Sequence, residues 1–242
     1  MNIRDVEFVS SFKKESDCPK DGRLEFAFIG RSNVGKSSLI NMLTNKKGLA
    51  KVSVTPGKTQ LINFFVINDS WYLVDLPGYG YARTSKDTRQ GFKPMIARYL
   101  ADREKMVCAF VLIDSRHELQ KIDREFLEWC GDNQVPFAIV YTKVDKLGKN
   151  KAISNIQSIN KEILQFYATL PTYFITSSEN RTGKEEVLGY IGKIMKDINN
   201  HDNAEDEIGF DDITTSNENH DIDVSYQSEA ASDKSVDQSD DL

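Results

Sequence analysis

A strand, a glycine-containing loop and a helix follow one another over residues 24–43, and this order constrains the fold more than any other part of the chain. The apolar strand pattern ends at Gly30, and the loop closes with Gly35-Lys36-Ser37. Glycine allows backbone conformations that side chains forbid, so successive N–H groups can turn into one concavity. The start of the following helix favours an anion at the same place. The pattern predicts a phosphate-binding loop in which Lys36 reaches the outer phosphates and Ser37 ligates a bound Mg²⁺.

Hydrophobic patterns divide the rest of the chain into alternating strands and helices. Residues 61–67 and 71–76 are predicted to be antiparallel strands joined by a turn at 68–70. The alternation predicts right-handed crossovers and a three-layer α/β/α fold, with a mainly parallel sheet of six strands that includes one antiparallel strand. Further strands are expected at 26–29, 107–113, 136–141 and 173–175, and helices at 36–45, about 88–103, 119–129, 151–168 and from a capping box at 182–185 to 198.

Charge is distributed unevenly along the chain, and this predicts three segments. Residues 199–242 contain 14 acidic residues and one lysine, a net charge of −13, and subtracting this from the −6 of the whole chain leaves residues 1–198 at +7. The acidic segment has few large apolar residues, so it cannot bury enough surface to offset its ordering entropy. We expect an extension with an edge strand at 1–22, one domain at 23–198 and a disordered acidic tail at 199–242. The tail is either a solubilising extension or an arm that competes for the basic face of the domain.

The three cysteines, Cys18, Cys108 and Cys130, show neither paired nor zinc-type spacing. A disulfide scaffold and a zinc site are therefore not expected. No signal peptide opens the chain, and no apolar run approaches the length of a membrane span. These features predict a cytoplasmic protein without a membrane partner.

Polar motifs follow three of the predicted strands, at the edge where parallel strands bind ligands. Asp75-Leu76-Pro77-Gly78 offers a carboxylate for a Mg²⁺-bound water and an N–H for a γ-phosphate, although Asp-x-Pro-Gly is also ordinary turn chemistry. In Thr142-Lys143-Val144-Asp145, the carboxylate of Asp145 can accept from N1–H and the exocyclic amine of guanine, a donor pair that adenine lacks, and the stem of Lys143 can lie along the base. A backbone N–H within Thr176-Ser177-Ser178 can bind guanine O6.

A fourth motif, Gly57-Lys58-Thr59-Gln60, lies in a predicted loop at 46–60. Thr59 is a candidate second Mg²⁺ ligand that engages only when a γ-phosphate is present. Each motif alone has an ordinary structural explanation, but their order, spacing and strand-end positions agree. Together they predict binding of GTP and GDP with Mg²⁺.

The hydrolytic step is less fully specified by the sequence. In Ras-type proteins a water-orienting glutamine follows the glycine of DxxG. Tyr79 takes that place here, and with a reference pKa of about 10 it cannot act as a general base near neutral pH. We therefore expect slow intrinsic turnover. Asn33 is a candidate helper because an asparagine at this place in other GTPases can hold a K⁺ ion; the alternative is that Asn33 only stabilises the loop by hydrogen bonds.

The motifs GRSNVGKSSLIN, TPGKTQLINFF, DLPGYGYA and TKVDK resemble those of the EngB (YsxC) family of bacterial ribosome-biogenesis GTP-binding proteins, over roughly residues 8–198. The resemblance implies the small G-protein form of the P-loop NTPase fold. It implies Mg²⁺ ligation by Ser37 and Thr59, and Asp75 is expected to ligate the ion through water. Lys36, Thr59 and Gly78 are the candidate catalytic residues, together with Asn33 as the candidate K⁺ ligand. The resemblance implies nucleotide contacts by Gly30, Arg31, Ser32, Asn33, Val34, Gly35, Lys36, Ser37, Gly57, Lys58, Thr59, Gln60, Leu61, Asp75, Leu76, Pro77, Gly78, Thr142, Lys143, Val144, Asp145, Thr176, Ser177 and Ser178.

The resemblance also implies a role late in large ribosomal subunit assembly, with a link to cell division and septation. We expect a cytoplasmic monomer that binds large-subunit precursors, with their rRNA and ribosomal proteins, and not DNA or membranes. Independent support comes from basic residues in or beside the loops at 46–60 and 77–90, although such a face can also be merely solvated. Two other hypotheses stay open: a G protein that signals through a protein partner, and an assembly factor that nucleotide stabilises with negligible hydrolysis.

Overall fold

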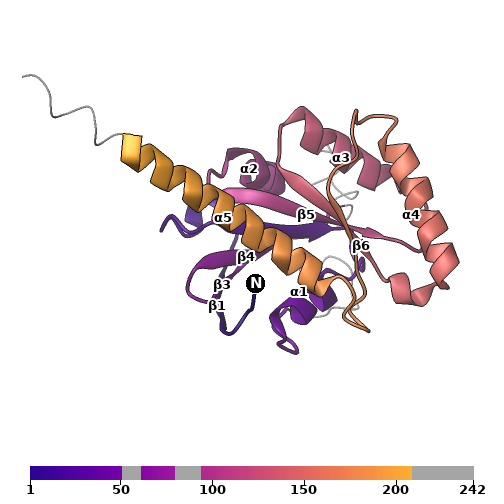
Figure 1. The fold of residues 1–242 in the computed structure, drawn as a ribbon, viewed down its shortest axis with the longest axis horizontal. Helices are drawn as coiled ribbons and strands as arrows, with labels where there is room; N and C mark the ends of the chain where they lie inside the picture. Colours follow the sequence, from indigo (N-terminus) through magenta and orange to yellow (C-terminus); the bar gives the residue numbers. More distant parts are fainter. Residues whose placement is uncertain (51–60, 80–93, 209–242) are drawn as a thin grey trace, which may run out of the picture. The chain divides into compact units, whose positions relative to one another are not determined.

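The computed structural model describes residues 1–50, 61–79 and 94–208, except the side chains of 202–208. The strands form one seven-stranded sheet in the order β1-β3-β4-β2-β5-β6-β7. Figure 1 shows this sheet among the helices. Among the described strands, β3 alone runs antiparallel to its neighbours, so the predicted mainly parallel sheet is confirmed. The strands are β1 (Val6–Phe12), β2 (Glu25–Gly30), β3 (Ile62–Ile67), β4 (Trp71–Asp75), β5 (Met106–Asp114), β6 (Phe137–Thr142) and β7 (Tyr173–Ile175).

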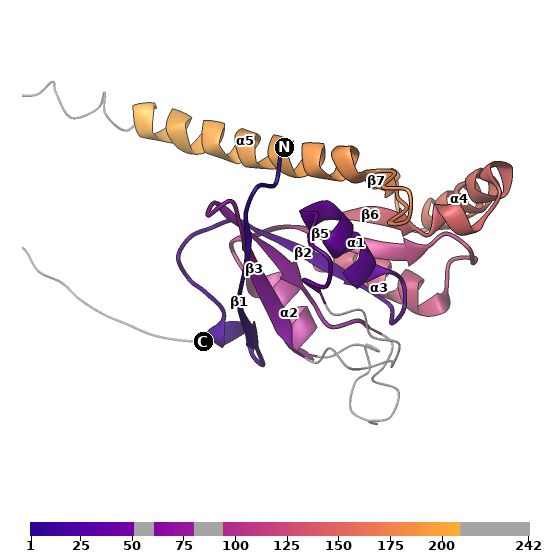
Figure 2. The ribbon, with the colours of Figure 1, turned by 90° about the horizontal axis from the view of Figure 1, so that it is seen from below.

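Helices cover both faces of this sheet, which confirms the predicted three layers (Figures 1 and 2). Buried side chains of α2, α3 and α4 pack on one face, and those of α1 and α5 on the other. Two short 3-10 turns, η1 (Glu15–Asp17) and η3 (Val144–Lys146), complete the described elements. The helices are α1 (Lys36–Thr44), α2 (Pro94–Asp102), α3 (Lys121–Asp132), α4 (Lys149–Ile163) and α5 (Lys184–Ile208).

The sheet has one strand more than the six predicted, because the N-terminal extension joins it. β1 pairs with β3, and the register shifts between Phe8 and Ser10. Asn68, in the turn between β3 and β4, holds the chain before β1: its Oδ1 accepts from the N–H groups of Arg4 and Asp5 at 2.8 and 3.0 Å. Asn68 and Asp69 both have φ near 50°, the left-handed conformation that a tight hairpin turn requires.

The end of α4 and the start of α5 differ from the sequence-based expectation. The predicted helix at 151–168 ends as α4 at Ile163, and the hydroxyl of Tyr167 beyond it donates to Leu127 O at 2.7 Å. The predicted capping box is wrong. The carbonyl of Gly183, not Thr182, accepts the first bond of α5 at 3.2 Å, while the Thr182 hydroxyl donates to Asn180.

The last helix is longer than expected. The structure forms two units, Met1–Asn200 and His201–Leu242, and α5 runs from the first into the second. Its end at Ile208 means that residues 199–208, which were predicted to be disordered, are helical, whereas 209–242 lie outside the described residues. Within the described part of the chain, none of the helices combines the length and apolar character that a membrane crossing needs.

All three cysteines are buried free thiols. Burial raises the pKa of Cys18 and of Cys108 to about 12 and shifts the pKa of Cys130 in the same direction. These thiols therefore remain protonated near neutral pH, which fits core positions.

Candidate functional site

The predicted phosphate-binding loop forms between β2 and α1 and needs glycine at both ends. Gly35 has a φ of 108°, and its carbonyl oxygen accepts from Leu39 N at 2.9 Å. Gly30 has no room for a side chain, since a Cβ there would lie 2.9 Å from Leu112 O. Asn33, between them, has a φ of 64°, which asparagine tolerates better than most residues. Backbone geometry therefore gives a reason for Asn33 besides the two that the sequence suggests.

Lys36 opens α1 and forms an ion pair with Asp75, the last residue of β4. Both side chains are largely buried, and Asn63 Nδ2 donates to the second oxygen of Asp75 at 3.3 Å. The structure thus joins two predicted site residues directly. Lys36 meets a carboxylate of the site here, at the edge where it is predicted to meet phosphate.

The residues near this pair fit the ligand preference of Mg²⁺. Ser37 follows Lys36 in the first turn of α1, and Lys36 is paired with the Asp75 carboxylate. Mg²⁺ prefers a few protein oxygens together with waters and phosphate oxygens. The described residues contain no group of three or more His, Cys, Asp or Glu side chains that could hold a metal by themselves.

The segment after Asp75 packs directly against the phosphate-binding loop. A Cβ on Gly78 would lie 2.8 Å from Gly30 O and 3.3 Å from Ser32 N, and Tyr79 forms an isolated parallel bridge with Arg31. The ring of Tyr79 is buried. Burial and the nearby Asp123 carboxylate raise the pKa of Tyr79 well above its ordinary value, so it stays protonated.

Thr142 and Lys143 join the end of β6 to the same loop. Thr142 Oγ1 donates to Val34 O at 2.6 Å, and Lys143 Nζ donates to Asn33 O. A Cβ on Gly35 would lie 3.5 Å from Lys143 Cε, so the lysine stem runs alongside the loop. The structure therefore brings the predicted guanine-recognition motif and the predicted phosphate loop into contact.

Asp145 lies in η3, and Ser177, in the segment after β7, orients its carboxylate. Ser177 Oγ donates to Asp145 Oδ1 at 2.6 Å, and Lys146 Nζ lies 3.0 Å from Oδ2. The Ser177 hydroxyl, followed by Lys146, lowers the pKa of Asp145 despite some desolvation, so it is ionised near neutral pH. An ionised carboxylate at this place can accept hydrogen bonds, as recognition of guanine requires.

The remaining predicted residues lie at the same edge or outside the described residues. Leu76 N donates to Phe28 O, Val144 N to Thr176 O and Thr176 N to Tyr141 O, which holds the strand ends together. Ser32 and Ser178 lie in the loops after β2 and β7, Pro77 lies between Leu76 and Gly78, and Leu61 directly precedes β3. Gly57, Lys58, Thr59 and Gln60 lie outside the described residues.

Asp114, the last residue of β5, is not one of the site residues predicted from the sequence. Its carboxylate accepts from Arg116 Nε at 2.9 Å and from Lys143 Nζ at 2.9 Å. Burial alone would raise the pKa of Asp114, but the hydrogen bonds from Arg116 and Lys143 outweigh it and lower the pKa to about 2. Its position at a strand end beside the other motifs is the signal that could have identified it.

Comparisons with known proteins agree with this geometry. Residues 25–143 match the family model described as 50S ribosome-binding GTPase. The chain is 53% identical over 198 residues to a probable GTP-binding protein EngB of Christiangramia forsetii, covering 82% of this chain and 100% of that protein. It is 56% identical over 199 residues to the corresponding protein of Bacteroides fragilis, covering 82% of this chain and 99% of that protein.

Two solved structures show the same fold. A crystal structure of a probable GTP-binding protein EngB has a TM-score of 0.53 and 24% identity, covering 72% of this chain and 99% of that one. Era in complex with MgGDPNP and a segment of 16S ribosomal RNA has a TM-score of 0.53 and 24% identity, covering 70% of this chain and 55% of that one. The chain is thus one of the P-loop GTP-binding proteins. Within this class it belongs to the EngB family.

Proposed function

We propose that this protein binds GTP and GDP with Mg²⁺, hydrolyses GTP slowly, and acts as a nucleotide-controlled factor in large ribosomal subunit assembly. We further propose that it works as a cytoplasmic monomer and that its loss disturbs cell division and septation, as the family resemblance implies. The basic domain and the ribosome-binding family model support an rRNA-containing partner.

The observation that carries the proposal is the contact between the two recognition motifs. Lys143 donates to Asn33 O, and Thr142 donates to Val34 O at 2.6 Å, so the base-recognising segment is fixed against the phosphate loop. Asp145, held by Ser177, then lies at the same edge. A guanine held there would have its phosphates in the loop, where the start of α1 and Lys36 carry the complementary charge.

The candidate site residues differ in whether they bind phosphate, hold Mg²⁺ or orient the attacking water. Backbone N–H groups of residues 30–37 and the Lys36 ammonium would bind phosphate oxygens, and Ser37, Thr59 and a water on Asp75 would hold Mg²⁺. When bound, Mg²⁺ would supply positive charge against the negative charge of the phosphates. Gly78 N–H meets the γ-phosphate. Tyr79 cannot orient water, because its ring is packed in the core, and this supports slow turnover without an external activator.

Guanine selectivity is tested by Asp145→Ala. Two charge-assisted hydrogen bonds disappear, so affinity for fluorescent GDP should fall by roughly 100-fold or more. Ser177→Ala, which removes only the group that orients Asp145, should give a smaller loss. Asp197→Ala, at an exposed position on α5, is the matched control. Unchanged guanine affinity in Asp145→Ala, or equal affinity of the wild type for ATP, would contradict the assignment.

The assembly role is tested by pelleting purified large-subunit precursors with the protein bound to GDP or to a non-hydrolysable GTP analogue. More protein should pellet in the GTP-analogue state. Equal binding in both states would refute the nucleotide-controlled switch. Capture of a protein partner without ribosomal particles would favour the signalling alternative instead.

The buried Tyr79 favours a second candidate, an assembly factor with negligible hydrolysis. Single-turnover phosphate release with and without large-subunit precursors separates it from the first. Comparison of turnover in K⁺ and Na⁺ buffers tests Asn33: Asn33→Ala should retain nucleotide binding and lose any K⁺ stimulation, and equal wild-type rates would remove the K⁺ hypothesis. Lys36→Ala, by contrast, should abolish nucleotide binding.

A further inference from the structure

Asp123, in the first turn of α3, carries a fully buried carboxylate that belongs to none of the sequence motifs. Arg31 Nε donates to its two oxygens at 3.0 and 2.8 Å, and the Tyr79 hydroxyl donates to Oδ1 at 2.9 Å. Arg31 is the first residue after β2, and Tyr79 is the first residue after Gly78. One carboxylate on a helix therefore holds the phosphate loop and the DxxG segment together.

Packing reinforces these hydrogen bonds. The Tyr79 ring stacks on Phe126, one turn after Asp123 on α3, with ring centroids 4.3 Å apart. The Arg31–Tyr79 bridge joins the two backbones directly, and Gly78 sits too close to Gly30 O to admit a Cβ. The close approach of Gly30 O to Gly78 and the bridge between Arg31 and Tyr79 thus fix the backbone of Gly78 relative to the loop.

We propose that Asp123 is a positioning residue for GTP: through Arg31 and Tyr79 it fixes the Gly78 N–H beside the phosphate loop and thereby favours GTP over GDP. This inference rests on the proposed function, because only a γ-phosphate distinguishes the two nucleotides at Gly78. In this proposal Tyr79, at the position where Ras-type proteins carry glutamine, attaches the Gly78 segment to Asp123. A carboxylate suits this role since hydrogen bonds to a charged acceptor are stronger than neutral ones.

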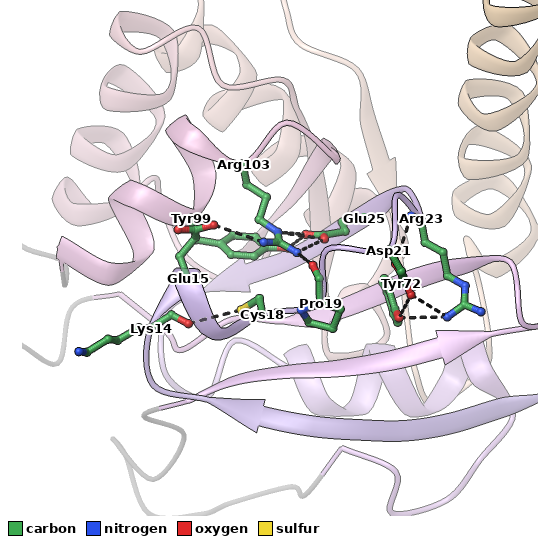
Figure 3. Close-up of polar contacts among 10 residues, drawn as sticks. All are labelled: Lys14, Glu15, Cys18, Pro19, Asp21, Arg23, Glu25, Tyr72, Tyr99 and Arg103. Atoms are coloured by element: carbon green, nitrogen blue, oxygen red, sulfur yellow. Dashed lines mark hydrogen bonds and ion pairs between the residues drawn. The ribbon is translucent and has the colours of Figure 1, made fainter.

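A similar buried cluster at the other end of β2 offers a matched control variant. Glu25, the first residue of β2, accepts from the Tyr99 hydroxyl at 2.5 Å and from Arg103 Nε at 2.9 and 2.8 Å (Figure 3). Tyr99 and Glu25 are buried like Tyr79 and Asp123. Tyr99→Phe therefore removes the same kind of hydrogen bond as Tyr79→Phe, but at the end of β2 away from the candidate site.

The test measures the affinities of a non-hydrolysable GTP analogue and of GDP, together with kcat and KM, for the wild type and both variants. In Tyr79→Phe the ratio of GTP-analogue affinity to GDP affinity should fall roughly tenfold, with GDP affinity unchanged and kcat reduced. Tyr99→Phe should lower the melting temperature and leave the ratio at its wild-type value. Asp123→Asn should change the ratio in the same direction as Tyr79→Phe.

An unchanged ratio in Tyr79→Phe, or equal weakening of both nucleotides, would overturn the positioning role. Should Asp123→Asn fail to fold, Tyr79→Phe decides alone, because its ring can keep the stack on Phe126. A wild-type protein that binds neither nucleotide would instead overturn the proposed function, so the two failures are distinct.

Discussion

Asp114 is a buried carboxylate that lies outside the sequence motifs but contacts residues of the candidate site. It holds Lys143 and Arg116 at the same time, and Lys143 in turn contacts the phosphate loop. Loss of Asp114 should therefore affect both the fold and the position of Lys143, which we propose lies along the guanine base.

The low pKa of Asp114 predicts a pH-dependent contribution to stability. Its pKa is about 2 in the folded protein and 3.8 for the ordinary side chain, so the folded state favours the ionised form. The contribution, on the order of 2 kcal/mol, is fully present above pH 3.8 and is lost as the pH falls toward 2. Urea unfolding of Asp114→Asn should show this loss at pH 7 and little difference from the wild type near pH 2. A difference that does not shrink on acidification would contradict the assignment.

The positions of residues in short local motifs could be predicted from the sequence. The glycine loop, DxxG and TKxD are each contained in a few residues, so their strand-end positions could be predicted. Asp123 could not be identified in this way, since its partner Arg31 lies 92 residues away and only the folded sheet brings them together. Tyr79 was recognised as an unsuitable base, but its burial on Phe126 required the structure.

At the scale of elements, the junction between β7 and α5 depends on one glycine. Gly183 has a φ of 78°, and a Cβ there would lie 2.3 Å from Ile175 O. The local pattern Thr182-x-x-Glu185 suggested an ordinary capping box, but the close approach of β7 decides how the helix starts. Tertiary contact therefore overrides the local signal here.

Gly183→Ala should destabilise the protein by roughly 2 kcal/mol or more, because the new Cβ combines a left-handed φ with a backbone clash. Gly189→Ala, within the following helix α5 and with nothing within 4 Å of the added Cβ, is the control. It should be neutral or stabilising by up to about 1 kcal/mol, since alanine is the better helix former. Thermal and urea unfolding measure both. Equal effects of the two variants would show that the junction is not constrained.

At the scale of the whole molecule, net charge gives a prediction that no single contact can. Residues 1–198 carry +7. If phosphate contacts hold the protein to rRNA, its affinity for large-subunit precursors should fall steeply, by tenfold or more, between roughly 50 and 200 mM salt. Nucleotide affinity, which depends on enclosed contacts, should change much less. A salt-independent affinity for the particle would point to protein contacts instead.

The acidic segment allows a second measurement in the same assay. Residues 209–242 contain ten acidic residues and one lysine. Removal of this segment should strengthen binding at low salt if it competes with RNA for the basic domain. No change would favour the solubilising extension, the other alternative that the sequence leaves open.

The order of the elements has a consequence for synthesis of the protein. α5 supplies Val187, Leu188 and Ile191 to the sheet face that α1 also covers, yet about 140 residues separate the two helices. At 5–20 residues per second, α5 is synthesised on the order of ten seconds after α1, and until then this sheet face lacks the side chains of α5. Every candidate site residue precedes Lys184. A nascent chain therefore contains all of the candidate nucleotide-binding residues before α5 has been made to complete the hydrophobic core.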